Sequence, residues 1–170
     1  MHLIPGSPRI VRADLEGREA LAQALGVRVP AEWPPEFFDA EALAFTLDIL
    51  ESHPGEADWW LYYFVRKASY LDPAVVVGVG GFRGAPENQT VELGYSIVPE
   101  YRRQGFASEA VQAFVAFAFA HAEVHCVRAQ TMPELRPSIG VLENCGFRLV
   151  GQGSDGPGTL CYERPRALDS

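Results

Sequence analysis

The chain has 170 residues, of which 48% are hydrophobic, 11% aromatic and 21% charged. This composition excludes a disordered chain, a collagen-like fibre and a disulfide scaffold, and the length fits a single domain spanning residues 1–170. Lys and Arg number 14 against 22 Asp and Glu, for a net charge of −8. An acidic surface repels phosphate backbones, so we expect no nucleic-acid partner and a preference for positively charged ones.

No segment reads as a membrane span or a signal peptide. The longest apolar run, residues 113–120, is far shorter than the roughly 20 residues that a spanning helix needs. Residues 1–6 lack the basic region and apolar core of a signal peptide. The three cysteines show no C-x-x-C spacing, which predicts reduced, mostly buried thiols and no metal site. We therefore expect a cytoplasmic protein with no membrane partner.

The first third of the chain predicts one short strand and two helices. Residues 8–12 are expected to form the strand, and apolar residues at helical spacing predict a helix over 14–25 that ends at Gly26. The prolines of residues 29–35 exclude a helix there. A second helix is expected over residues 36–52, where apolar residues again recur at helical spacing.

The remaining two thirds alternate between β-rich and helical patterns, which indicates a mixed α/β domain. Strands are expected over 59–66, 75–82, 90–98, 126–131, from 147 onward, and over 159–164. Helices are expected over 106–121 and 136–145. The glycines of residues 78–81 lack the spacing of a nucleotide-binding loop, and backbone crowding in the sheet explains them better.

A short basic loop between a strand and a helix carries the clearest functional signal. The first turn of a helix leaves backbone N–H groups without partners, and with the helix dipole they form an anion site suited to a pyrophosphate. Gly105 lets the backbone approach the phosphates closely, and the small Ala107 keeps the path clear. Arg102 and Arg103 are expected to supply the opposite charge.

This loop matches a known family signature. Arg102-x-x-Gly105-x-Ala107 resembles the R/Q-x-x-G-x-G/A pattern of the GNAT superfamily of acyl-CoA-dependent N-acyltransferases. Residues 92–102 before it resemble the family's fourth strand, and residues 138–147 resemble its second motif. The resemblance covers roughly residues 59–164 and is strongest to the branch with the Rim-type ribosomal-protein N-terminal acetyltransferases.

The resemblance implies a GNAT fold, in which helices flank a central mixed, mostly antiparallel sheet whose strands splay around the acyl-CoA site. Residues 1–58 would hold the N-terminal strand and acceptor-site helices, 59–131 the sheet and pyrophosphate loop, and 132–170 the C-terminal helix and strands. It further implies acetyl-CoA as co-substrate and no metal, and it leaves room for a homodimer.

The resemblance also implies which residues bind the cofactor. They are Ile97, Val98, Arg102, Arg103, Gln104, Gly105, Phe106, Ala107 and Ser108. The main chain of Ile97 and Val98 would pair with pantetheine like an added strand. The N–H of Val98 or its neighbour would face the thioester oxygen, and Pro99 would end this ladder because it has no N–H.

The catalytic residues follow from the same resemblance. Glu92 matches the position that acts as general base in several relatives; alternatively, it orders the strand or binds the acceptor amine. Many relatives carry a Tyr as leaving-group acid where this chain has Leu142. Ser138 lies one helical turn earlier on the same face, so it either donates to the departing sulfur or satisfies backbone donors at the helix start.

Two functional hypotheses follow. The first is an N-acetyltransferase that transfers the acetyl group by direct attack of a primary amine, on a small molecule or at a protein N-terminus. The second is a non-catalytic domain that binds or senses acyl-CoA, because Leu142 and Leu135 stand where relatives carry Tyr and Asn. Turnover with any amine separates the two hypotheses.

Overall fold

The computed structural model describes residues 1–167, which form two compact units. The first unit comprises residues 1–81 and 95–107, and the second comprises residues 82–94 and those from 108 onward. Strand β4 (Thr90–Ile97) and helix α4 (Phe106–Ala120) contribute residues to both units. Each unit is described by itself.

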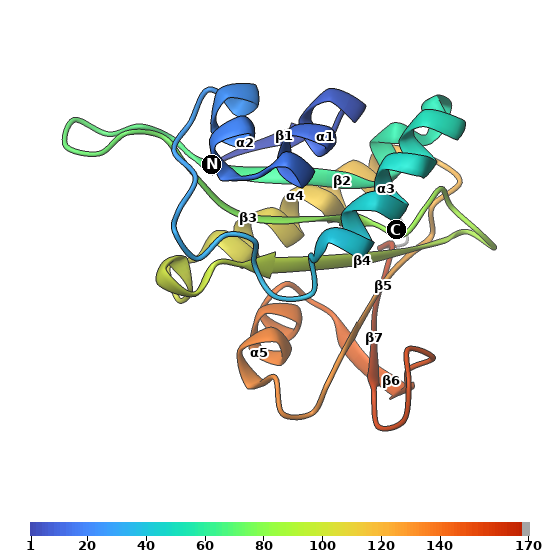
Figure 1. Cartoon of the computed structure of the whole chain (residues 1–170). Helices are drawn as coiled ribbons and strands as arrows, with labels where there is room; N and C mark the ends of the chain where they lie inside the picture. The colour runs from blue at the N-terminus through green and yellow to red at the C-terminus, as the bar shows by residue number, and fades with distance from the viewer. Residues whose placement is uncertain (168–170) are drawn as a thin grey trace. The chain divides into compact units, whose positions relative to one another are not determined.

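Seven strands form one mixed sheet in the order β1-β2-β3-β4-β5-β7-β6 (Figure 1). Besides β4 they are β1 (His2–Pro5), β2 (Leu61–Arg66), β3 (Val75–Phe82), β5 (Cys126–Thr131), β6 (Arg148–Gln152) and β7 (Leu160–Pro165). Strands β4 and β5 run parallel, whereas β1 with β2, β2 with β3, β5 with β7 and β6 with β7 are antiparallel. The predicted fold class, a mixed and mostly antiparallel sheet flanked by helices, is confirmed.

The predicted strand over residues 8–12 is wrong, because these residues form helix α1 (Pro8–Glu16). The side chain of Ser7 accepts the N–H of Ile10 at 3.3 Å and caps the helix, and Pro8 occupies the first turn, where its missing N–H costs nothing. The strand of this region is β1, four residues long and too short for its pattern to stand out.

The helix predicted over 14–25 is instead two helices, and the one predicted over 36–52 is shorter. Gly17, with φ of +136°, separates α1 from α2 (Arg18–Leu25), and α1 packs against α2 and α3 (Ala40–Ser52). Helix α3 starts after Asp39, whose side chain accepts the N–H of Ala42 at 2.9 Å. Residues 29–35 are not helical, as expected.

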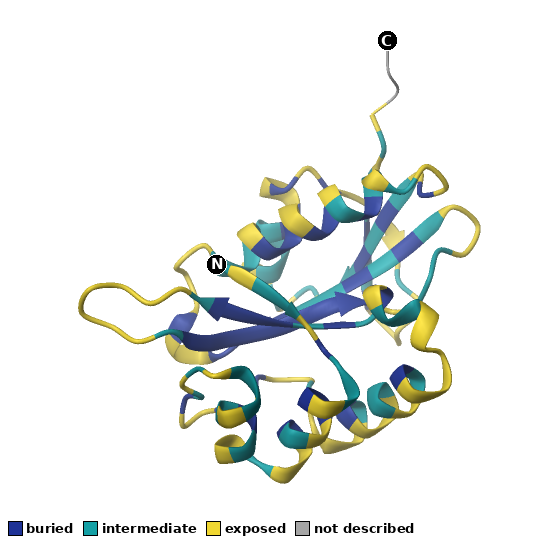
Figure 2. Ribbon diagram, turned by 90° about the horizontal axis from the view of Figure 1, so that it is seen from above, coloured by how far each residue is buried: buried dark blue, intermediate teal, exposed yellow. Residues whose placement is uncertain are grey.

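The core of the first unit is built around β3, which is buried along its whole length. Figure 2 shows buried residues running along the central strands, and exposed ones on the loops and on the helices. The interpretation of the glycines in β3 as sites of backbone crowding is confirmed. A Cβ atom at Gly78 would lie 2.5 Å from the carbonyl oxygen of Ser96, and one at Gly81 would overlap that of Trp60.

In the second unit, β5, β7 and β6 form an antiparallel layer against which α5 (Arg136–Asn144) packs (Figure 1). Buried apolar residues of α4 include Phe114, whose ring centroid lies 5.4 Å from that of Phe82. The guanidinium of Arg166 donates to the carbonyl group of Phe119, near the end of α4, and to those of His121 and Val124 in the turn that follows. Within residues 1–167, no helix is both long and apolar enough to cross a bilayer.

Candidate active site

The predicted cofactor loop follows β4 in the first unit. A single 3₁₀ turn, Pro99–Tyr101, leads to four exposed residues, 102–105, before α4 begins at Phe106. Gly105 has φ of +86°, a left-handed conformation that favours glycine, and a Cβ atom there would meet no atom within 4 Å. Glycine is therefore needed for the backbone conformation, and the space in front of it is open.

At the end of β4, the main-chain N–H groups of Ile97 and Val98 point in opposite directions. The Val98 N–H donates to the carbonyl oxygen of Val77 in β3 at 2.9 Å, so of the two N–H groups expected to face a thioester that of Val98 is occupied. Neighbouring residues of a strand direct their N–H groups to opposite edges, so the Ile97 N–H points away from β3. The parallel register of β4 with β5 runs from Thr90 to Leu93, whereas β4 continues to Ile97.

The two arginines of the loop have different environments. Arg102 Nε donates to the carbonyl oxygen of Ile97 at 3.0 Å, and its NH2 lies 3.2 Å from Glu36 Oε2. Arg103 is exposed, has φ of +62° and contacts no hydrogen-bonding or ionic partner within residues 1–167. The charge of Arg102 is thus paired with Glu36, whereas Arg103 has no such partner within residues 1–167.

A second contact joins the N-terminal part of the first unit to the same loop. Arg28 donates to the hydroxyl of the buried Tyr101, and its own main chain pairs with β3 through Ala74 and Val76 at 3.0 Å each. Together with the pair of Glu36 and Arg102, this contact fixes residues 28–36 against the base of the loop.

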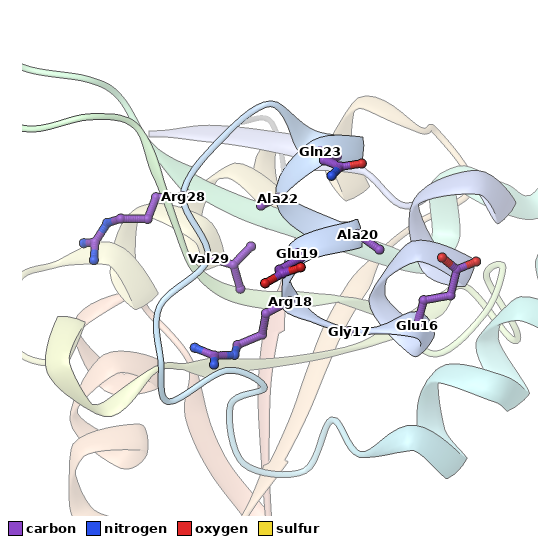
Figure 3. Close-up of a pocket in the computed structure, with 9 residues that line it drawn as sticks. All are labelled: Glu16, Gly17, Arg18, Glu19, Ala20, Ala22, Gln23, Arg28 and Val29. Carbon is purple, nitrogen blue, oxygen red and sulfur yellow. The ribbon is translucent and has the colours of Figure 1, made fainter.

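Arg28 also lines a hollow of about 810 Å³ at α2 (Figure 3). Its lining comprises Glu16, Gly17, Arg18, Glu19, Ala20, Ala22, Gln23, Arg28 and Val29. The side chains of Glu16 and Arg18 point in different directions in Figure 3. None of these nine residues is among those predicted to act in catalysis or cofactor binding.

Glu92, the predicted base, belongs to a polar network of the second unit. Its side chain is 20% exposed, and Oε1 lies 3.0 Å from Arg83 NH1 while Oε2 accepts from Gln130 Nε2 at 3.0 Å. Arg83 NH1 also lies 2.8 Å from both carboxylate oxygens of Asp155. Each carboxylate oxygen has two lone pairs, so Glu92 keeps further acceptor capacity beyond these two partners.

Sequence reasoning missed the partners of Glu92. Asp155 is far from Glu92 in sequence, and both Arg83 and Asp155 lie in bends. No motif singles out either residue. Gln130 offered a weak signal, because β5 alternates between buried and half-buried positions and Gln130 occupies one of the latter.

Ser138, the predicted proton donor, lies in the first turn of α5. The N-cap position is Leu135, whose side chain makes no capping bond, so Ser138 does not hold that position. Ser138 is half-buried, and Leu142, on the same helical face, is 1% exposed. Within the described residues of the second unit, the structure thus places Glu92, Ser108 and Ser138, while Ile97 to Ala107 lie in the first unit.

The cysteines are free, and Cys145 and Cys161 are buried as predicted. Burial raises the pKa of the Cys126 thiol to about 11, and it also raises the pKa of Cys145. A thiol with a raised pKa is protonated at neutral pH and is a poor nucleophile. Cys145 and Cys161 are core residues, and Cys126 is half-buried.

Comparison with known proteins places the chain in a family. Residues 11–148 match the family model of the acetyltransferase (GNAT) domain. The chain is 30% identical over 144 residues to the uncharacterized N-acetyltransferase YjdG of Bacillus subtilis. The aligned region covers 84% of this chain and 82% of that protein.

Solved structures show the same fold. A GNAT-family acetyltransferase from Bacillus anthracis matches with a TM-score of 0.62 and 21% identity, over 96% of this chain and 93% of that one. RimJ of Mycobacterium smegmatis, in complex with CoA-disulfide, matches with a TM-score of 0.61 and 20% identity, over 96% of this chain and 80% of that one.

The fold and the family match together define an acyl-CoA-dependent acetyltransferase. The chain belongs to the GNAT acetyltransferase family, and RimJ of Mycobacterium smegmatis shares its fold. Members of this family generally use acetyl-CoA and act on amine acceptors.

Proposed function

We propose that the chain transfers the acetyl group of acetyl-CoA to a primary amine on a cationic acceptor, either a small-molecule amine or a protein N-terminus. One observation carries this proposal. Residues 29–65 contain eight Asp and Glu and no Lys or Arg, while the rest of the chain holds 14 residues of each sign. The whole net charge of −8 therefore falls in one stretch of the first unit.

The acidic stretch is connected to the proposed cofactor loop. It contains α3 and Glu36, and Glu36 is the residue paired with Arg102 at the base of that loop. An acidic surface attracts positively charged molecules and raises their local concentration. An acceptor drawn to residues 29–65 would thus be held beside the loop that we assign to acetyl-CoA.

For acetyl-CoA, the loop supplies an anion site and the end of β4 supplies main-chain groups. The N–H groups of Gly105, just before α4, and of Phe106, Ala107 and Ser108 in its first turn would hold the pyrophosphate. Arg103, which has no charged partner within residues 1–167, would add its positive charge. Gln104 supports the loop through its bond to the carbonyl of Glu100 at 3.2 Å. The Ile97 N–H, rather than that of Val98, would meet the pantetheine or the thioester oxygen.

In the chemical step, the amine nitrogen forms a bond to the acetyl carbon and the carbon–sulfur bond breaks. Glu92 would take the proton released by the amine, directly or through a water molecule. The Ile97 N–H would stabilise the negative charge that develops on the thioester oxygen. Ser138 would donate a hydrogen bond to the departing thiolate, and a thiolate is stable enough to need no stronger acid.

The test is an acetylation assay with acetyl-CoA and three acceptors: spermidine, a basic peptide with a free N-terminal serine, and the same peptide with a blocked N-terminus. We expect turnover of spermidine or the free peptide, and none of the blocked one. Glu92→Gln should lower kcat by about 100-fold or more and leave acetyl-CoA affinity unchanged. Glu87→Gln, an exposed glutamate close by in sequence, is the matched control.

Each outcome bears on a different part of the proposal. Acetyl-CoA binding without turnover of either free amine would overturn the proposed acceptor class. Full activity of Glu92→Gln would overturn the role of Glu92 alone and leave its alternative role, ordering of the strand or binding of the acceptor.

A further inference from the structure

Gln130 uses every polar atom of its side chain at once. Its Nε2 donates to Glu92 Oε2 at 3.0 Å and to Ser154 Oγ at 3.1 Å. Its Oε1 accepts the main-chain N–H groups of Ser154 at 2.6 Å and Asp155 at 3.0 Å. One amide therefore joins the β4 carboxylate that we assign to catalysis to the turn between β6 and β7.

The orientation of this amide is determined by its surroundings. Two main-chain N–H groups face one end of the side chain, and only an oxygen accepts from both. The nitrogen must then lie at the other end, where it meets the Glu92 carboxylate. The turn thus fixes the orientation of the Gln130 amide, and the amide in turn fixes the rotation of the Glu92 carboxylate.

The residue before Ser154 is a glycine for a reason tied to this amide. A Cβ atom at Gly153 would overlap Gln130 Oε1 and lie 3.0 Å from Gln130 Cδ and 3.1 Å from Thr159 Cβ. Because the backbone of Gly153 is not left-handed, the requirement is one of space alone. Any side chain at this position pushes the Gln130 amide out of its place.

We propose that Gln130 is a positioning residue for Glu92, and that Gly153 provides the space in which its amide reaches both Glu92 and the β6–β7 turn. Gln130 acts through Glu92 and need not touch the substrate. The second partner of Glu92, Arg83, is bound to the same turn through Asp155, so the turn holds the carboxylate by two routes. This inference rests on the proposed catalytic role of Glu92.

The test compares four variants with the amine that the wild type acetylates fastest in the assay above. Gln130→Met keeps the length of the side chain but removes its polar atoms. Gly153→Ala displaces the amide without removing it, and the double variant combines both changes. Gln152→Met, an exposed glutamine beside the same turn, is the control.

We expect Gln130→Met and Gly153→Ala each to lower kcat by about 10- to 100-fold while KM for acetyl-CoA stays within about twofold, since small displacements of a reacting group cost this much. The double variant should be no slower than Gln130→Met, because Gly153 acts only through the amide. Gln152→Met should match the wild type. Amide hydrogen exchange provides a second readout: the N–H groups of Ser154 and Asp155 should exchange faster in Gln130→Met.

Three results would overturn the inference. In the first, Gln130→Met keeps the wild-type kcat although Glu92→Gln is inactive. In the second, the effects of Gln130→Met and Gly153→Ala multiply in the double variant. In the third, exchange at Ser154 and Asp155 is unchanged. If Glu92→Gln itself is fully active, the proposed role of Glu92 fails instead, and faster exchange would still show that the amide holds the turn.

Discussion

At the scale of single residues, Asp14 is a carboxylate that the fold buries in the first unit. It is 9% exposed, and it accepts from Trp33 Nε1 at 2.7 Å and from the Tyr63 hydroxyl at 2.9 Å. The ring centroids of Trp33 and Tyr63 lie 6.1 Å apart. Asp14 therefore joins α1 to β2 and to the loop that leads to Glu36.

Removal of the Asp14 carboxylate should destabilise the fold. Asp14→Ala leaves the indole N–H and the phenol hydroxyl without partners in a buried place, so we expect a loss of about 2–4 kcal/mol in the free energy of unfolding. Asp14→Asn keeps an acceptor and a donor there and should lose less. Urea denaturation of both variants measures the difference, and equal stability of all three proteins would contradict this role.

The stability contributed by Asp14 also depends on pH. Burial is the main reason that the pKa of Asp14 is raised from its ordinary value of 3.8, and the bonds from Trp33 and Tyr63 offset part of this. Between 3.8 and the raised pKa, the folded state binds more protons than the unfolded state, so stability falls as pH rises through this window. Relative to Asp14→Asn, the free energy of unfolding of the wild type should fall as pH rises through this window, and it should not change further at higher pH.

At the scale of elements, the contacts of the two arginines in the loop between β4 and α4 predict different roles for them. Arg103→Gln should weaken acetyl-CoA binding by about tenfold without a change in Tm, because Arg103 is exposed and pairs with no described residue. Arg102→Gln should instead lower Tm by about 2–4 °C, because it leaves the Ile97 carbonyl and Glu36 without their partner.

Calorimetry and thermal unfolding of both variants test this division. If Arg102→Gln weakens binding tenfold at an unchanged Tm, Arg102 is the phosphate ligand and the assignment is reversed.

The elements also show where sequence patterns succeed. The β4–α4 loop and the strands around it were predictable because Gly105 and the β-branched run of β3 report local conformation directly. The helix at residues 8–16 was not, because its capping by Ser7 outweighs the β-branched residues within it. The network around Glu92 was not predictable either, because Gln130 and Asp155 meet only through the register of β5 with β7 and the turn after β6.

At the scale of the whole chain, the charge distribution predicts a salt effect. If residues 29–65 attract a cationic acceptor, its KM should rise severalfold between 20 and 300 mM salt, because screening shortens the reach of the charges from about 20 to 6 Å. The double variant Glu32→Gln/Glu41→Gln should raise KM at low salt and flatten this dependence.

Glu123→Gln/Glu134→Gln removes the same charge outside the acidic stretch and is the control; all four glutamates are exposed. Equal effects of the two double variants would show that net charge, and not its location, governs the acceptor.

The central claim, that the β4–α4 loop binds acetyl-CoA, is tested most directly by calorimetric titration of three proteins. These are the wild type, Gly105→Glu, and Gly26→Glu as control. Both glycines are left-handed, with φ of +86° and +68°, and a Cβ atom at either would meet no atom within 4 Å. The two variants therefore share the same strain and charge.

We predict micromolar binding to the wild type and Gly26→Glu, and a loss of at least about 100-fold in Gly105→Glu, whose side chain would block and repel the pyrophosphate. Equal affinity of Gly105→Glu and Gly26→Glu, or no binding to the wild type, would contradict the account.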